Sequence, residues 1–155
     1  MKKSTLCFCI KDDQVLLAMK KRGFGSGKWN GYGGKVQAEE NPITAAVREL
    51  EEESGLVADE KDLQQVALVR FYFDGNPVFE CFVYMTNSWQ SEPVETEEMR
   101  PQWYPISNLP FEEMWAADAK WIPLILNGER IEAEVNFNAD GSVVKEFGYK
   151  PAKFN

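Results

Sequence analysis

The sequence predicts a single α/β domain over residues 1–155, and three observations support this prediction. Apolar or β-branched runs flank polar turns near the start, middle and end of the chain, as in β-hairpins. Two other segments carry start and stop signals of helices. The chain is 44% hydrophobic and 13% aromatic, so we expect a substantial buried core rather than disorder.

The first predicted element is a hairpin with strands at 5–10 and 15–19 around a polar turn. A glycine-dense stretch follows at 23–34, which contains too much glycine for a helix. Because this stretch also carries aromatic residues that need burial, we expect an ordered loop with a short strand. The alternative, a flexible linker, would be rich in Gly and Ser and poor in aromatic residues.

The first helix is predicted from Pro42 to Glu53. Asn41 is a candidate N-cap, Pro42 suits the first helical position, and Gly55 suits the position past the end. Apolar residues of this segment recur at i, i+3, i+4 and i+7, which places them in one stripe facing the core. The stripe consists of Ile43, Ala46, Val47 and Leu50.

A second helix is predicted from Asp118, as its N-cap, to Leu126, with Pro123 in its early turns or at a kink. The remaining predicted elements are strands bounded by polar or glycine-containing turns. They form a middle hairpin, a short single strand and a final hairpin, at 66–73 with 78–86, at 103–106, and at 131–137 with 142–149.

Composition excludes several classes of function. The formal net charge is −8, so we expect no general affinity for nucleic acid or for an anionic membrane. The chain has no histidine, which excludes Ser-His-Asp and Cys-His nucleophile systems and His-ligated zinc or haem. No run reaches the roughly 18 apolar residues of a membrane span. Acid–base chemistry is therefore left to carboxylates, Lys or Tyr.

The three cysteines, Cys7, Cys9 and Cys81, are too few for a four-ligand zinc site and odd in number for a disulfide framework. We interpret them as buried reduced thiols of a cytoplasmic protein. The apolar run at 6–10 is shorter than the roughly 7–15 residues of a secretory signal core. No amphipathic surface element indicates a dimer, so we expect a monomer.

Three glutamates of the first helix, Glu49, Glu52 and Glu53, lie at i, i+3 and i+4 and share a second face. Like charges at these spacings destabilise a helix by roughly 0.2–0.5 kcal/mol per pair. One interpretation is a solvated acidic face. The other is a site for Mg²⁺ or Mn²⁺, which prefer carboxylate, carbonyl and phosphate oxygens. The adjacent glycine-rich loop favours the metal site.

Arg48 lies on the same helix, within reach of Glu52 and of the loop that carries Glu40. Its guanidinium can orient carboxylates by bidentate pairing. The alternative is an ordinary surface ion pair, which contributes at most about 1 kcal/mol.

The spacing of Gly34, Glu40 and the run Arg48–Leu56 matches every fixed position of the Nudix box, here residues 34–56. The chain therefore resembles the Nudix hydrolases. The resemblance covers nearly the whole chain and fades after about Gly128. Four other runs are similar to the MutT-homologue subgroup, which hydrolyses oxidised purine nucleoside triphosphates. They are Lys20–Gly25, Trp29–Val36, Glu98–Pro101 and Leu109–Trp115.

This resemblance implies the Nudix fold, an α/β/α sandwich with a mixed β-sheet and a loop–helix–loop box. It also implies Mg²⁺, with Mn²⁺ as an alternative, held by Glu49, Glu52, Glu53 and the carbonyl of Gly34 or its neighbour. Glu98 resembles a further carboxylate of the subgroup, which acts as a ligand or as the base, although it could also be one more solvated acid. The implied catalytic residues are Glu53, Glu52, Glu98 and Arg48.

The implied reaction is hydrolysis of a purine nucleoside triphosphate, such as 8-oxo-dGTP or 2-hydroxy-dATP, to the monophosphate and pyrophosphate. In this reaction the metal polarises the phosphates and acidifies water, and a carboxylate takes the proton. Such an enzyme removes damaged nucleotides from the nucleotide pool. Two alternatives are a Nudix pyrophosphohydrolase for another nucleoside diphosphate derivative and a catalytically silent nucleotide-binding module.

The resemblance also implies an aromatic site for the base. By position, Asn30 resembles the amide that reads the base edge and Trp115 the ring that stacks on the base. The other implied substrate-binding positions are Thr5, Lys20, Phe24, Phe71, Phe73, Phe79 and Asp118. The alternatives are that the aromatic residues serve only the core and that Lys20 is solvated.

The chain departs from the subgroup at one position. After the tryptophan the subgroup carries two adjacent aspartates, whereas this chain has Ala117 and keeps only Asp118. Two close carboxylates can share a proton and so present a donor or an acceptor. We therefore expect hydrolysis to be retained and the preference among purine bases to be altered.

Overall fold

The structure is a computed structural model that describes residues 1–154. It combines strands and two α-helices, as the predicted α/β class requires. In chain order they are β1 (Lys2–Lys11), β2 (Gln14–Lys20), β3 (Trp29–Asn30), α1 (Pro42–Ser54), the 3₁₀ turn η1 (Glu60–Asp62), β4 (Gln64–Phe73), β5 (Asn76–Thr86), β6 (Met99–Pro105), the 3₁₀ turn η2 (Phe111–Glu113), α2 (Asp118–Leu126), β7 (Ile131–Phe137) and β8 (Val144–Pro151).

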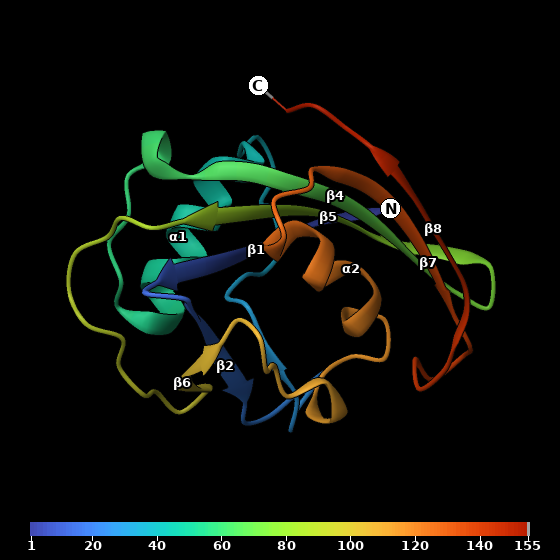
Figure 1. The fold of residues 1–155 in the computed structure, drawn as a ribbon, viewed down its shortest axis with the longest axis horizontal. Coiled ribbons are helices and arrows are strands. Elements are labelled where there is room, and N and C mark those ends of the chain that lie inside the picture. Colours follow the sequence, from blue (N-terminus) through green and yellow to red (C-terminus); the bar gives the residue numbers. More distant parts are fainter. Residues whose placement is uncertain (155) are drawn as a thin grey trace.

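The strands form one mixed sheet (Figure 1). Its order is β3-β2-β1-β5-β4-β7-β8, and β6 pairs with β2. The pairs β1·β5 and β4·β7 are parallel, and the other pairs are antiparallel. The three predicted hairpins are all present, as β1–β2, β4–β5 and β7–β8.

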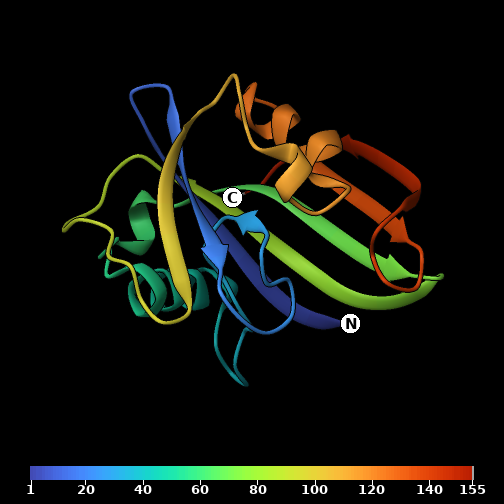
Figure 2. The same ribbon diagram turned by 90° about the horizontal axis from the view of Figure 1, so that it is seen from below.

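The two helices cover opposite faces of this sheet (Figure 2). Neighbouring residues of β1 point to opposite faces, so Cys7 packs in one cluster with Leu50 of α1, and Phe8 packs in another with Trp121 of α2. The predicted α/β/α sandwich is thus confirmed. All three cysteines are free and buried.

Helix α1 begins and ends where the sequence predicts, apart from one additional residue, Ser54. Pro42 is in the first turn, although the side chain of Asn41 makes no capping hydrogen bond. Gly55 adopts the left-handed conformation with φ 81°, and its N–H bonds to the carbonyl of Glu51. This arrangement satisfies a carbonyl of the last turn.

Several predicted boundaries were wrong, among them those of β1, which runs from Lys2 to Lys11, and of β8, which runs from Val144 to Pro151. The strand expected at 103–106 is longer and begins at Met99, because its pairing with β2 runs from Met99 opposite Lys20 to Pro105 opposite Gln14. Asp118 is not the N-cap of α2. Ala117 holds that position, and Asp118 is the first helical residue with a side chain only 3% exposed. None of the helices in residues 1–154 is long and apolar enough to cross a membrane.

Candidate active site

The Gly33–Gly34 loop lies directly against the acidic face of α1. The Gly33 N–H donates to Oε1 of Glu53 at 3.0 Å. A Cβ atom on Gly34 would stand 2.6 Å from Cδ of Glu49, and one on Gly33 would stand 1.7 Å from the carbonyl oxygen of Thr5. Only glycine fits between strand β1 and the two carboxylates, which explains the glycine pair.

Glu53 is the carboxylate of α1 with the strongest perturbation. Burial, followed by the negative charge of Glu49, raises the pKa of Glu53 to about 7. Glu53 also lines the cavity that lies next to α1. A group with a pKa near neutrality can take up and release a proton under physiological conditions.

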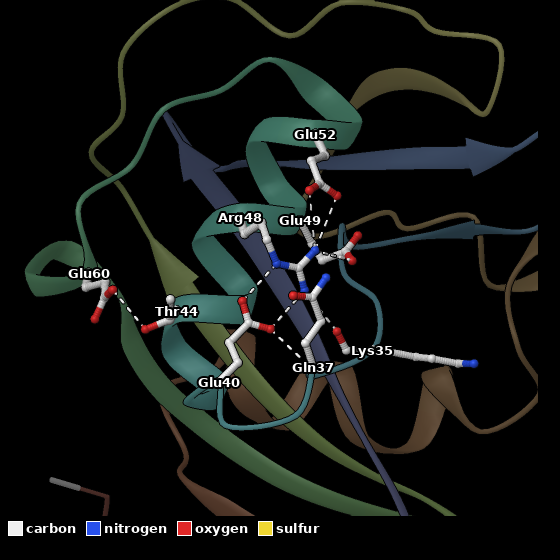
Figure 3. Close-up of polar contacts among 8 residues, drawn as sticks. All are labelled: Lys35, Gln37, Glu40, Thr44, Arg48, Glu49, Glu52 and Glu60. Carbon is white, nitrogen blue, oxygen red and sulfur yellow. Dashed lines mark hydrogen bonds and ion pairs between the residues drawn. The ribbon is translucent and has the colours of Figure 1, made fainter.

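Arg48 ties the acidic residues of the box together (Figure 3). Its Nε and Nη2 donate to the two oxygens of Glu40 at 2.8 and 3.0 Å, a bidentate pair. Its Nη1 donates to Oε1 of Glu49 at 3.0 Å and approaches Oε2 of Glu52 at 3.3 Å. Pairing with Arg48 lowers the pKa of Glu40 to about 2. Arg48 therefore positions the box rather than forming an isolated surface pair.

Glu98 lies in the loop before β6 and is held by two residues that directly follow β2. Nε of Arg22 donates to Oε1 of Glu98 at 2.7 Å, and this pairing lowers the pKa of Glu98. Lys21 holds the same loop through its backbone N–H, which donates to the carbonyl of Glu98 at 2.8 Å. Its Nζ also donates to the carbonyl of Thr96 at 2.6 Å.

The predicted metal ligands are only partly assembled. Glu49 and Glu53 flank the Gly33–Gly34 loop, whereas Glu52 points to Arg48 and Glu98 to Arg22. Across residues 1–154, no three side chains of His, Cys, Asp or Glu form a group that could hold a metal ion. The donors nevertheless suit a hard divalent cation, because they are carboxylate oxygens, and burial followed by the negative charge of Glu49 raises the pKa of Glu53.

A cavity of about 280 Å³ lies next to this acidic face. Seven of its lining side chains are aromatic, and Glu53 and Gly34 of the box also line it. All nine residues predicted to bind substrate line it. They are Thr5, Lys20, Phe24, Asn30, Phe71, Phe73, Phe79, Trp115 and Asp118.

Among the residues that line the cavity are buried polar atoms without hydrogen-bond partners. Oγ1 of Thr5, Oδ2 of Asp118 and Nε1 of Trp121 are buried and have no partner at full hydrogen-bond geometry within residues 1–154, although an interaction with the Trp121 side chain partly offsets the rise in the pKa of Asp118. A buried polar atom left unsatisfied costs about 1–3 kcal/mol, so such atoms indicate a missing ligand or water. Oδ1 of Asn30 accepts the Gly31 N–H at 2.8 Å, which leaves its amide nitrogen as a donor.

Asp118 is fully enclosed at the base of the cavity. Burial raises its pKa from 3.8 to about 7. The carboxyl group can therefore be either protonated or ionised near neutral pH. It can donate a hydrogen bond in the first state and only accept in the second.

Several lining residues were not predicted from the sequence, among them Lys28, Phe137 and Trp121. Lys28 places Nζ 5.4 Å from the centroid of the Trp115 ring, and its position beside Trp29 in the glycine-dense stretch was the available signal. Phe137 lies 5.1 Å from Phe73 between ring centroids. Phe137 lies in the part of the chain where the family resemblance has faded. Trp121 belongs to the apolar stripe of α2, which serves the core. Neither residue therefore gave a signal for the site.

Comparisons with known proteins found a matching family model and similar relatives. The NUDIX domain model matches residues 1–125. An oxidized purine nucleoside triphosphate hydrolase of Danio rerio is 43% identical over 142 residues, which cover 91% of this chain and 90% of the relative. The protein of the same name from Mus musculus is 40% identical over 141 residues, 90% of this chain and 89% of the relative.

The fold has a solved counterpart. The crystal structure of a MutT protein from Bacillus halodurans superposes with a TM-score of 0.82 and covers 99% of this chain and all of that one. At 22% identity, this likeness concerns the fold alone. It extends through β7 and β8, which lie beyond the residues that the domain model matches.

Proposed function

Because this chain belongs to the NUDIX domain family, we propose that it hydrolyses oxidised purine nucleoside triphosphates. Substrates of this class include 8-oxo-dGTP and 2-hydroxy-dATP, and the products are the monophosphate and pyrophosphate. The observation that carries the proposal is the aromatic cavity with unpartnered polar atoms beside the acidic face of α1. The names of the relatives from Danio rerio and Mus musculus support the same activity.

Nudix hydrolases generally use a divalent metal ion, and we propose Mg²⁺ here, with Mn²⁺ as the alternative. Glu49, Glu53 and the Gly34 carbonyl would hold it, joined by Glu52 and Glu98 once these leave their arginine partners. When bound, the ion would neutralise phosphate charge and acidify a water molecule. The oxygen-only donor set supports this assignment.

Three other side chains have separate roles in the proposed reaction. Glu53 can accept a proton, because burial and the charge of Glu49 raise its pKa to about 7. Arg48 holds Glu40 and Glu49 in place through its ion pairs. Glu98 stands in the loop before β6 as a further ligand or as the base.

The base would enter the aromatic cavity. Trp115 supplies the stacking surface, and the amide nitrogen of Asn30 and the carboxyl of Asp118 supply hydrogen bonds to the base edge. Stacking on an aromatic side chain contributes about 1–3 kcal/mol per base. The unpartnered Oδ2 of Asp118 supports this role, since a base edge would satisfy it.

Pyrophosphate release is the direct test. We expect release from 8-oxo-dGTP or 2-hydroxy-dATP in the presence of Mg²⁺ and none after chelation. A nucleotide sugar and a dinucleotide should be poor substrates. Faster turnover of either would support the alternative of a pyrophosphohydrolase for another nucleoside diphosphate derivative. Tight nucleotide binding without turnover would support a silent binding module.

Restoring the second acidic residue should change the ranking of bases. Ala117 is fully buried beside Asp118, so in Ala117→Asp the two carboxyl groups would share a proton and present both a donor and an acceptor. We expect kcat/KM to shift by about tenfold or more for some purines and not for others. Ala116→Asp, which adds the same charge at an exposed neighbour, is the control. Equal rankings in all three proteins would contradict the role of position 117.

We also propose that the protein is a cytoplasmic monomer whose partner is a small nucleotide. The net charge of −8 supports a partner other than nucleic acid or an anionic membrane. The three free, buried cysteines support a reducing compartment.

A further inference from the structure

The turn between β7 and β8, residues 138–143, is held in shape by its own side chains. Oδ1 of Asn138 accepts the Val143 N–H at 3.0 Å, and the Asn138 N–H donates to the Val143 carbonyl at 2.9 Å. Oδ1 of Asp140 accepts the Ser142 N–H at 2.9 Å. The turn lies outside residues 1–125, which the family model matches. It is therefore an ordered element of this chain whose role the family match does not define.

Gly141 brings the backbone of this turn against the aromatic cavity. A Cβ atom at Gly141 would stand 2.8 Å from Cζ3 of Trp115 and 3.0 Å from Cε2 of Phe73. These distances are shorter than carbon atoms tolerate, so the space next to the Trp115 ring is filled by glycine backbone alone. Gly141 also has φ +77°, which L side chains rarely adopt.

Trp115 is restrained on its other side by the loop that follows β2. The Phe24 ring lies 5.1 Å from the Trp115 ring between centroids, and Nζ of Lys28 lies 5.4 Å from the Trp115 centroid. A Cβ atom at Gly25 would contact Cζ2 of Trp115 at 3.4 Å. Trp115 belongs to neither η2 nor α2. Its ring is held by these two loops together with Phe137 of β7, whose ring lies 6.0 Å away between centroids.

We propose that the β7–β8 turn is a positioning element of the base site and that Gly141 fixes the ring of Trp115 at the width a purine base requires. The inference rests on the proposed function, in which Trp115 stacks on the base. Gly141 does not touch the substrate. It acts through Trp115, because any atom added at Gly141 must push the ring toward the cavity.

The matched pair Gly141→Ala and Gly75→Ala tests this proposal. Gly75 has the same φ of +77° and lies in the β4–β5 turn, where an added Cβ atom would have no neighbour within 4 Å among residues 1–154. Both changes strain a left-handed residue, so we expect each to lower Tm by a few degrees, and Gly141→Ala to lower it further because its Cβ atom also meets Trp115. Only Gly141→Ala should raise KM for 8-oxo-dGTP, by about tenfold or more, with kcat changed less than about threefold.

Binding of the monophosphate 8-oxo-dGMP, measured by calorimetry, provides a readout besides turnover. Its Kd should rise about tenfold or more in Gly141→Ala and stay at the wild-type value in Gly75→Ala. Equal behaviour of the two variants, with a wild type that binds and hydrolyses purine nucleotides, would overturn the role of Gly141 alone. A wild type that neither binds nor hydrolyses them would overturn the proposed function.

If Gly141→Ala does not fold, Asn138→Ala decides the question. This variant removes the two side-chain hydrogen bonds of Asn138 within the turn and adds no atom near Trp115. We expect Kd for 8-oxo-dGMP to rise about threefold or more, because the turn loses its fixed shape. A Kd equal to that of the wild type would overturn the proposal.

Discussion

Replacing Glu53 with glutamine is expected to lower kcat by roughly 10²- to 10⁴-fold while leaving the fold in place. Glutamine keeps the oxygen that accepts the Gly33 N–H at 3.0 Å. It removes the charge that burial and Glu49 make unfavourable, so the folded state should not lose stability. What is lost is a metal ligand and a proton acceptor. Steady-state kinetics of pyrophosphate release, together with thermal unfolding, measure both effects.

Glu51→Gln provides the control for this experiment. Glu51 lies on the same helix, two residues before Glu53, and is exposed to solvent. The substitution changes the net charge by the same amount without touching the Gly33–Gly34 loop. We expect kcat to remain within about twofold of the wild-type value. Turnover retained in Glu53→Gln would remove Glu53 from the catalytic residues.

Replacing Asp118 with asparagine is expected to lower kcat/KM for the preferred purine about 10- to 150-fold at neutral pH. A hydrogen bond to a charged group contributes about 1.5–3 kcal/mol, and asparagine can supply only a neutral one. The effect should depend on the base, since Asp118 lies in the aromatic cavity and not at the carboxylates of α1. Competition assays between two purine triphosphates measure this dependence.

Asp118→Asn should also remove a pH-dependent decrease in the free energy of unfolding. Burial raises the pKa of Asp118 from 3.8 to about 7, so ionisation of this carboxyl opposes folding. Below about pH 4 the group is protonated in both the folded and unfolded states and imposes no cost. The cost grows as pH rises from about 4 to 7 and is constant above 7.

The free energy of unfolding of Asp118→Asn, relative to wild type, should therefore increase between pH 4 and pH 8. The increase is at most roughly 4 kcal/mol, because one pKa unit corresponds to 1.36 kcal/mol. Urea denaturation at both pH values measures it. Asp62→Asn, at an exposed position of η1, should show no comparable increase. A flat difference for Asp118→Asn would contradict the assignment of this carboxyl as a buried, titrating group.

Local signals were sufficient to predict most elements of the fold. Pro42 and Gly55 mark the ends of α1 because each has a backbone preference that acts without tertiary contacts. The boundaries that were wrong depend on partners distant in sequence. The length of β6 follows from its pairing with β2. Asp118 does not cap α2, and its side chain instead lines a cavity formed with residues of other strands.

The candidate site could be predicted only in part, for a related reason. Helical spacing places Glu49, Glu52 and Glu53 on one face, yet it does not determine which group each carboxylate contacts. The structure directs Glu53 to Gly33 and Glu52 to Arg48. Arg22, which holds Glu98, is 76 residues away along the chain. Gly141 lies against the Trp115 ring because the β7–β8 hairpin folds back on itself, and no local sequence pattern indicates this contact.

The short connection between Thr5 and the glycine pair has a consequence for ligand length. The Thr5 N–H donates to the Gly34 carbonyl at 2.9 Å, and Thr5 also lines the aromatic cavity. Backbone bonds on either side, from the Cys7 N–H to the Tyr32 carbonyl and from the Val36 N–H to the Lys3 carbonyl, also join this loop to β1. Because the base cavity and the acidic face share this strand, we expect the protein to favour ligands with one length between base and cleaved phosphorus over shorter or longer ones.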